Sequence, residues 1–266
     1  MAQSAKVRVA AAGDVHAARG DAERLRDVFE AASVEADLVL LAGDLTAHGD
    51  PAEAAELGAA CAGLDAEVVA VLGNHDWHQD RQDEVTRELE RAGVTVLQRS
   101  LVVCRVHGLE VGIVGTKGFV GGFPGASLPD FGERLLREVY AESSAEVHAL
   151  REGLATVAHC PLRIVLLHYS PSLQTLHGEP EGIWAFLGDE RLAGPIVEFH
   201  PDLVLHGHAH AGRLQGSIGA VPVFNVALPV TGGEFWFFEL DPRPGTIASG
   251  LVEAPADGGR GAHTRA

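Results

Sequence analysis

Short apolar runs alternate with amphipathic segments over the N-terminal third of the chain. The apolar runs, each suited to a buried strand, are Val7–Ala12, Leu38–Ala42 and Glu67–Leu72. The segments that follow them carry apolar residues at helical spacing and are Asp21–Ala32, Pro51–Leu64 and Gln79–Ala92. This order of strand and helix predicts a largely parallel sheet joined by right-handed crossovers.

The middle of the chain loses this regular alternation. Three short runs with tight connections predict antiparallel strands at Thr95–Gln98, Leu101–Arg105 and Leu109–Gly115. A glycine-rich stretch, Gly115–Gly125, comes next. Phe131–Val157 then has one long helical pattern, and a break near Ser143 and Ser144 is left open.

The final third returns to buried strands. These are predicted at Arg163–Leu167, Asp202–Leu205, Val221–Asn225 and Glu234–Leu240, and they complete a second sheet. No polar linker divides the chain, so we expect one α/β domain with two sheets over residues 1–252. Residues 253–266 have no periodicity and predict a frayed tail.

Composition narrows the class of protein. Of the 266 residues, 46% are hydrophobic and 21% are charged, as in an ordinary globular chain. The formal net charge of −17 repels phosphate backbones at long range, which argues against a nucleic-acid binder. A small phosphate ester stays compatible with it, because bound metal ions can dominate the potential inside a site.

The sequence predicts neither a disulfide framework nor a membrane segment. The cysteines are odd in number and have no CxxC spacing: Cys61, Cys104 and Cys160. The N-terminal apolar stretch is too short for a signal peptide, and no apolar run approaches the roughly 18 residues of a membrane span. We therefore expect a cytoplasmic protein without a membrane partner, and a homo-oligomer stays compatible with the sequence.

Residues that can bind metals follow five of the predicted strands directly. They form the blocks GDVH (13–16), GD (43–44), GNHD (73–76), His168 and GHAH (207–210). The carboxyl ends of strands in open α/β sheets share one edge, so these blocks are expected to converge. Asp14 and His16 are two residues apart, and in extended chain such side chains share a face.

The types of donor indicate which metals would bind. Carboxylate, imidazole and amide donors together suit manganese, iron, zinc or cobalt. The donors are too many for a single tetrahedral ion. They suit two ions about 3.5–4 Å apart that share one carboxylate.

The five blocks, in this order, resemble the signature of the calcineurin-like metallophosphoesterases. The resemblance implies a four-layer fold, a two-sheet mixed sandwich flanked by helices, that binds two metal ions (Mn, Fe or Zn). It implies that a hydroxide between the ions attacks phosphorus, with His75 stabilising the transition state or protonating the leaving oxygen. The implied ligands are Asp14, His16 and His210 for one ion, Asn74, His168 and His208 for the other, and Asp44 for both.

Other polar residues near these blocks are not part of the implied ligand set. Asp76 is a candidate catalytic residue that orients His75, and the alternative is a helix cap. His206 is expected to be structural, and His48 to be a solvated loop histidine. Lys117 in the glycine-rich stretch suits an ordinary turn better than a phosphate site. We expect the pocket walls at Gly115–Pro129 and Tyr169–Trp184.

The function expected from these features is hydrolysis of a small-molecule phosphate ester, with a diester slightly favoured. The protein phosphatases of the family continue their second block as GDxVDRG, whereas this chain has GDLTAHG, which argues against a phosphoprotein substrate. One alternative is hydrolysis of a nucleotide pyrophosphate linkage at the same site. The other is a binding or scaffold module without catalysis, although every signature position is filled here.

Overall fold

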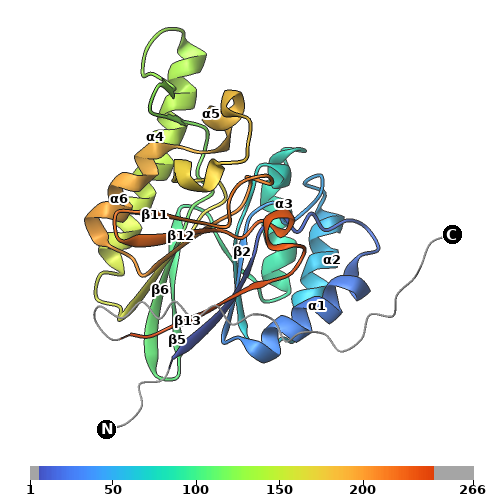
Figure 1. Ribbon diagram of the computed structural model, residues 1–266. Coiled ribbons are helices and arrows are strands. Elements are labelled where there is room, and N and C mark those ends of the chain that lie inside the picture. Colours follow the sequence, from blue (N-terminus) through green and yellow to red (C-terminus); the bar gives the residue numbers. More distant parts are fainter. Residues whose placement is uncertain (1–5, 243–266) are drawn as a thin grey trace, which may run out of the picture.

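The computed structural model describes residues 6–242 and stacks two mixed β-sheets between layers of helices (Figure 1). One sheet contains β1 (Val7–Ala12), β2 (Leu38–Ala42), β3 (Glu67–Val71), β4 (Thr95–Leu97) and β13 (Trp236–Leu240). The other contains β5 (Ser100–Val106), β6 (Leu109–Gly115), β9 (Leu162–Leu166), β10 (Leu203–His206), β11 (Gln215–Ile218) and β12 (Val221–Asn225). Their strand orders are β13-β1-β2-β3-β4 and β11-β12-β10-β9-β6-β5. A small ribbon pairs β7 (Gly122–Phe123) with β8 (Ala126–Ser127).

Helices cover the outer face of each sheet. The first sheet is covered by α1 (Ala22–Glu35), α2 (Pro51–Cys61) and α3 (Gln82–Arg91). The second is covered by α4 (Arg134–Thr156) and α6 (Ala193–Phe199). Two short helices, α5 (Trp184–Leu187) and α7 (Leu228–Thr231), lie in connections. Single 3₁₀ turns are η1 (His75–Trp77), η2 (Leu173–Leu176), η3 (Glu181–Ile183) and η4 (Glu190–Leu192).

The apolar pattern of β2 explains how the sheets stack. Every residue of β2 is buried, because successive side chains point to opposite faces and both faces are covered. Leu38 and Leu40 enter the core between the two sheets, whereas Val39 and Leu41 pack under the helices. The predicted fold class, a two-sheet α/β sandwich flanked by helices, is therefore confirmed.

Two strand predictions were wrong. β4 pairs parallel with β3 rather than antiparallel with a neighbour, because α3 forms a crossover between them. β13 joins the first sheet, pairing antiparallel with β1, rather than the second. An apolar pattern indicates that a strand is buried, but it does not indicate which sheet the strand joins. Phe238 of β13 packs in the core between the two sheets, to which both sheets contribute.

The second half of the chain differs from the prediction in smaller ways. α4 continues through Ser143 and Ser144, because their hydroxyls donate to the carbonyl oxygens of Val139 and Tyr140 within the helix. β11 was not predicted, because its polar residues (QGSI) lack a strand pattern. The expected tail at 253–266 lies outside the described residues. No helix within residues 6–242 is both long and apolar enough to cross a membrane.

Candidate metal centre

The predicted metal-binding blocks lie at the carboxyl ends of parallel strands. β1, β2 and β3 run parallel in the first sheet, and β9 and β10 run parallel in the second. Asp14, Asp44 and Asn74 follow the first three strands, and His168 and His208 follow the other two. The two sheets therefore bring residues that are distant in sequence to one edge of the sandwich.

The backbone at this edge is not the extended chain that the i, i+2 spacing suggested. Asp14, His16, Asp44 and His208 have φ angles of 59°, 47°, 50° and 70°, which lie in the left-handed region. Such conformations are rare outside glycine and concentrate at functional sites. Asp14 and His16 do lie in one group of possible donors, but tight turns bring them together and not strand alternation.

Glycine is required where these turns meet. Gly43 has a φ of +81°, and a Cβ there would lie 2.5 Å from Nδ1 of His168. A Cβ on Gly73 would collide with the Asp44 carboxylate. The side chains of the centre can approach one another only because these positions carry none.

The first group of predicted ligands gathers around Asp14, which is 3% exposed. Nε2 of His210 lies 2.8 Å from Oδ1 of Asp14, and the backbone N–H of His208 donates to Oδ2 at 2.9 Å. His16 completes this group, and one donor atom from each of its three side chains lies within 4.8 Å of the others. Three donor atoms at these separations leave a space that suits one metal ion.

The second group gathers around His168, whose side chain is fully buried. Its Nδ1–H donates to the carbonyl oxygen of Ala42 at 2.9 Å, which leaves Nε2 as the ring nitrogen that faces the candidate metal site. That atom faces Oδ1 of Asn74 at 2.9 Å and Oδ1 of Asp44 at 3.3 Å. Nε2 and these two oxygens are atoms that can bind a metal ion, and they converge at this point.

Asp44 belongs to both groups. Its Oδ1 faces His168, whereas its Oδ2 lies 3.9 Å from Nε2 of His16 and 3.9 Å from Nε2 of His75. Oδ1 also accepts the backbone N–H of His75 at 2.8 Å. The two oxygens of one carboxylate thus address different histidines.

The electrostatic environment shifts the pKa values of three predicted ligands. Burial lowers the pKa of His208 to about 3, so the ring is neutral at pH 7. Burial alone would raise the pKa of Asp14, but the hydrogen bond from His210 and nearby histidines outweigh it and lower the pKa. The same hydrogen bond raises the pKa of His210, because the Asp14 carboxylate stabilises the protonated ring.

Some residues near the centre point elsewhere. His206 donates from Nδ1 to the carbonyl oxygen of Gly207 and accepts at Nε2 from the Thr175 hydroxyl, both at 2.8 Å, so its ring is structural. His48 is exposed and bonds to Glu53. Asp76 is fully buried, and its carboxylate accepts hydrogen bonds from the chain segments that carry Asp44 and Asn74. Burial raises the pKa of Asp76 to about 6.

Two aromatic residues lie near the centre: Tyr169, which the sequence placed only in a predicted pocket wall, and Trp77, to which it gave no role. The ring of Tyr169 lies 4.5 Å from that of His208. Trp77 is 38% exposed and follows His75 by two residues. Their adjacency in sequence to His168 and to the GNHD block is the signal that could have identified them.

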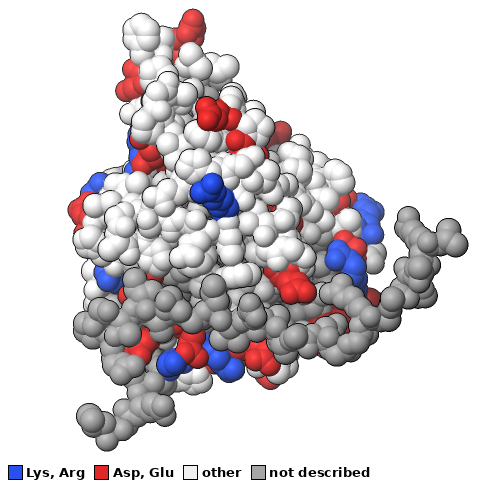
Figure 2. Space-filling model, in the orientation of Figure 1, with Lys and Arg blue, Asp and Glu red and all other residues white. Residues whose placement is uncertain are grey.

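The surface charge agrees with a small-molecule substrate. On the face shown in Figure 2, basic side chains of the described residues stand singly or in small groups among acidic ones. A nucleic-acid site would need a continuous basic surface.

Comparison with known families identifies the chain. The model of the calcineurin-like phosphoesterase family matches residues 7–212, which includes all five blocks. The chain belongs to this family. It is therefore a metal-dependent phosphoester hydrolase, and its Asp and His clusters can hold metal. A search of curated proteins finds no significant match.

Solved structures share the fold at low sequence identity. Phosphopantetheinyl hydrolase (PptH) from Mycobacterium tuberculosis has a TM-score of 0.63 at 16% identity, covering 85% of this chain and 90% of that chain. TT1561 of Thermus thermophilus has a TM-score of 0.52 at 18% identity, covering 90% and 100%. GAP50, the anchor in the inner membrane complex of Plasmodium, has a TM-score of 0.54 at 11% identity, covering 92% and 87%. These similarities establish the fold alone.

Proposed function

We propose that the chain hydrolyses a small-molecule phosphodiester at a centre of two metal ions. One ion would be held by Asp14, His16 and His210, the other by Asn74, His168 and His208, with Asp44 contributing to both. The observation that carries this proposal is the placement of Asp44, whose Oδ1 and Oδ2 face His168 and His16 respectively. A carboxylate that only capped a turn would not need one oxygen near each of the two groups.

The donor set fits the metals expected from the sequence. Imidazole, carboxylate and amide donors together suit manganese, iron or zinc. Bound there, two such ions would offset charge on phosphate oxygens and lower the pKa of water toward about 7.

His75 is the residue that we assign to proton transfer. Nδ1–H of its ring donates to the carbonyl oxygen of Ala47 at 2.8 Å, which directs Nε2 toward Oδ2 of Asp44 and the centre. The side chain is 34% exposed and therefore reachable by substrate. Protonated at Nε2, the ring would stabilise a phosphate oxygen or give its proton to the leaving oxygen.

Asp76 acts in this proposal as a positioning residue. Its carboxylate accepts the N–H groups of Leu45 at 3.1 Å and Gly73 at 2.7 Å, one from each of the loops that carry Asp44 and His75. It therefore fixes the separation of these two residues, and it reaches the His75 ring only through them.

The distribution of charge favours a diester over a monoester. A monoester dianion needs more cationic partners than a diester monoanion. Arg99, which lines a cavity near the centre, is already paired with Glu142 and Glu146. Lys117 is then the one unpaired cation of that lining among the described residues.

Hydrolysis of a nucleotide pyrophosphate linkage is the second candidate function. Such an enzyme would use the same metal ligands and differ in the walls of its substrate pocket. A scaffold module is the third candidate, and GAP50 shows that an anchoring protein can share this fold. The complete ligand set of this chain favours catalysis over that role.

The test compares turnover of bis-(p-nitrophenyl) phosphate and p-nitrophenyl phosphate by the manganese-supplied protein. We expect a higher kcat/KM for the diester, and in His75→Ala a kcat about 100-fold lower with metal content unchanged. His48→Ala is the matched control, because this exposed histidine lies outside the ligand groups. A wild-type protein that turns over neither compound, or prefers the monoester, contradicts the proposal.

A further inference from the structure

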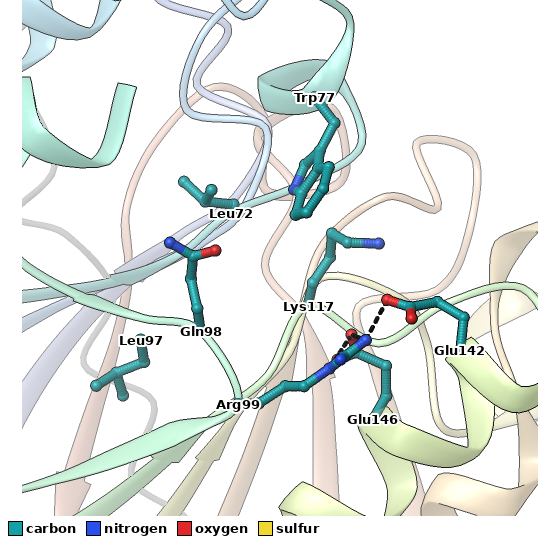
Figure 3. Close-up of a pocket in the computed structure, with 8 residues that line it drawn as sticks. All are labelled: Leu72, Trp77, Leu97, Gln98, Arg99, Lys117, Glu142 and Glu146. Carbon is teal, nitrogen blue, oxygen red and sulfur yellow. Dashed lines mark hydrogen bonds and ion pairs between the residues drawn. The ribbon is translucent and has the colours of Figure 1, made fainter. Parts of the chain in front are cut away.

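A cavity of about 240 Å³ lies beside the metal centre (Figure 3). Three of its lining residues are tied to the ligand segments: Leu72 and Trp77 flank the GNHD block, and Lys117 accepts the backbone N–H of His168 with its carbonyl oxygen. Pockets that enclose a whole drug-sized ligand have volumes of about 300–1,000 Å³. This cavity therefore suits one substituent of a substrate whose phosphate lies at the centre.

The ammonium group of Lys117 stands among aromatic rings. Nζ lies 4.4 Å from the ring centroid of Phe119, 5.1 Å from that of Tyr169 and 5.6 Å from that of Trp77. Such contacts stabilise a cation without neutralising it. Within residues 6–242 its one hydrogen bond goes to the carbonyl oxygen of Gly118 at 3.2 Å, and an ammonium has three donors. Two donors are thus left for a ligand.

The other charged side chains that line the cavity form ion pairs with one another. Nε of Arg99 donates to Oε1 of Glu146 at 2.9 Å, and its guanidinium also pairs with Glu142. Oε2 of Glu146 accepts the backbone N–H of Gly118 at 2.9 Å and the hydroxyl of Thr116. Glu146 therefore anchors the loop that carries Lys117 without pairing with its ammonium. Burial lowers the pKa of Lys117, which reflects the cost of holding this charge away from water.

Trp77 provides a flat apolar surface at one end of the cavity. Figure 3 shows its indole ring at the opposite end from Arg99 and the two glutamates, with Lys117 between them. Leu72 and Leu97 line the cavity as well. A ring that enters the cavity would find an aromatic face and apolar side chains around it.

We infer that Lys117 contacts a phosphate oxygen of the substrate, and that the cavity holds a flat aromatic substituent of the same phosphodiester against Trp77. This inference rests on the proposed function and specifies its substrate class, aryl or heteroaryl phosphodiesters. With Lys117 assigned to the phosphate, the other charged groups of the lining are Arg99, Glu142 and Glu146, which pair with one another and disfavour a negatively charged substituent.

The test uses two phosphodiesters, dimethyl phosphate and diphenyl phosphate. They carry the same charge, and their methoxy and phenoxy groups are poor leaving groups. Their dissociation constants for the manganese-supplied protein are measured by calorimetry, so that the result does not depend on turnover. The two substituents of each compound are identical, so diphenyl phosphate presents a ring to the cavity in either orientation. We expect the wild type to bind diphenyl phosphate more tightly.

The Trp77 variants test the aromatic contact. Trp77→Ala should weaken diphenyl phosphate about 10-fold and leave dimethyl phosphate unchanged, since stacking on an aromatic ring contributes this much in other sites. Trp77→Phe keeps a flat ring and should retain most of the preference. Equal affinities for the two compounds in the wild type, or an unchanged ratio in Trp77→Ala, overturn this part.

The lysine variants test the phosphate contact. Lys117→Met should weaken both compounds about 10-fold, because a hydrogen bond to a charged group is lost for each. Lys117→Arg keeps a cation and should retain more affinity than Lys117→Met. Lys6→Met is the matched control, because Lys6 is paired with Glu239 on β13. If Lys117→Met melts like the wild type and binds both compounds unchanged, the contact does not exist.

The two proposals fail in different ways. A wild type that hydrolyses no phosphodiester but shows these binding patterns refutes the proposed function and leaves the cavity assignment standing. A wild type that hydrolyses bis-(p-nitrophenyl) phosphate but loses no binding in either variant refutes the cavity assignment alone.

Discussion

Asp76 accepts two hydrogen bonds from Thr46, one from the backbone N–H at 2.8 Å and one from the hydroxyl at 2.6 Å. Leu45 and Gly73 donate to the other oxygen of the same carboxylate. This buried group joins the turn after β2 to the turn after β3, and so fixes Asp44 against Asn74. A side chain that is not among the predicted ligands therefore organises the candidate metal centre.

Replacement of Asp76 should therefore affect both stability and metal binding. Asp76→Ala leaves several buried donors without a partner, and we expect the free energy of unfolding to fall by about 3 kcal/mol. Thr46→Val removes only the hydroxyl and should cost about 1 kcal/mol. Urea unfolding of the two variants checks the order. An Asp76→Ala protein as stable as the wild type would show that the carboxylate does not organise these turns.

Gly73 should tolerate no side chain, because a Cβ there collides with the Asp44 carboxylate. We expect Gly73→Ala to lose about 1–3 kcal/mol of stability and to bind metal more weakly. Gly182→Ala is the control, because a Cβ at that position meets no atom within 4 Å. Manganese titration of both proteins decides the matter, and equal affinities would refute the steric argument.

His206 and His208 should respond differently to replacement, although they are two residues apart. Both ring nitrogens of His206 are used within the protein, so His206→Ala should lower stability by about 1–3 kcal/mol and keep the metal content. His208→Ala should instead lose metal. Elemental analysis of the metal content of both variants distinguishes the structural histidine from the ligand. If His206→Ala lost metal and His208→Ala kept it, the two assignments would be wrong.

Glu146 and Glu142 both pair with Arg99 but differ in burial. Glu146 is 3% exposed and also holds Gly118, so Glu146→Ala should cost about 3 kcal/mol. The side chain of Glu142 is 48% exposed, and Glu142→Ala should cost no more than about 1 kcal/mol. Thermal unfolding of the two variants gives the comparison. Equal losses would mean that the anchoring of the Lys117 loop contributes little.

The sequence indicated the convergence of the predicted metal-binding blocks better than it indicated the partners of the strands. Each ligand block follows a strongly apolar strand, and parallel strands have only one carboxyl edge, so convergence follows from local patterns. The placement of β13 depends instead on which sheet has an open edge beside β1, which no local pattern encodes. The role of Asp76 was equally hidden, because its partners Leu45 and Thr46 are distant in sequence and donate mainly through the backbone.

Lys117 illustrates a third limit. A lysine in a glycine-rich stretch suits a surface turn, and the sequence gives no reason to prefer another position. Its burial depends on Tyr169 and Trp77, which reach it from two other loops. Only the tertiary structure brings a cation and these rings together beside the ligands.

The most direct test of the central claim is the number of metal ions bound per chain, measured by elemental analysis after manganese loading and removal of free ions. The shared position of Asp44 predicts about two ions for the wild type, as in other two-metal sites. Asp44→Ala should hold fewer, because both groups lose a donor. A wild type that binds one ion or none would contradict the account.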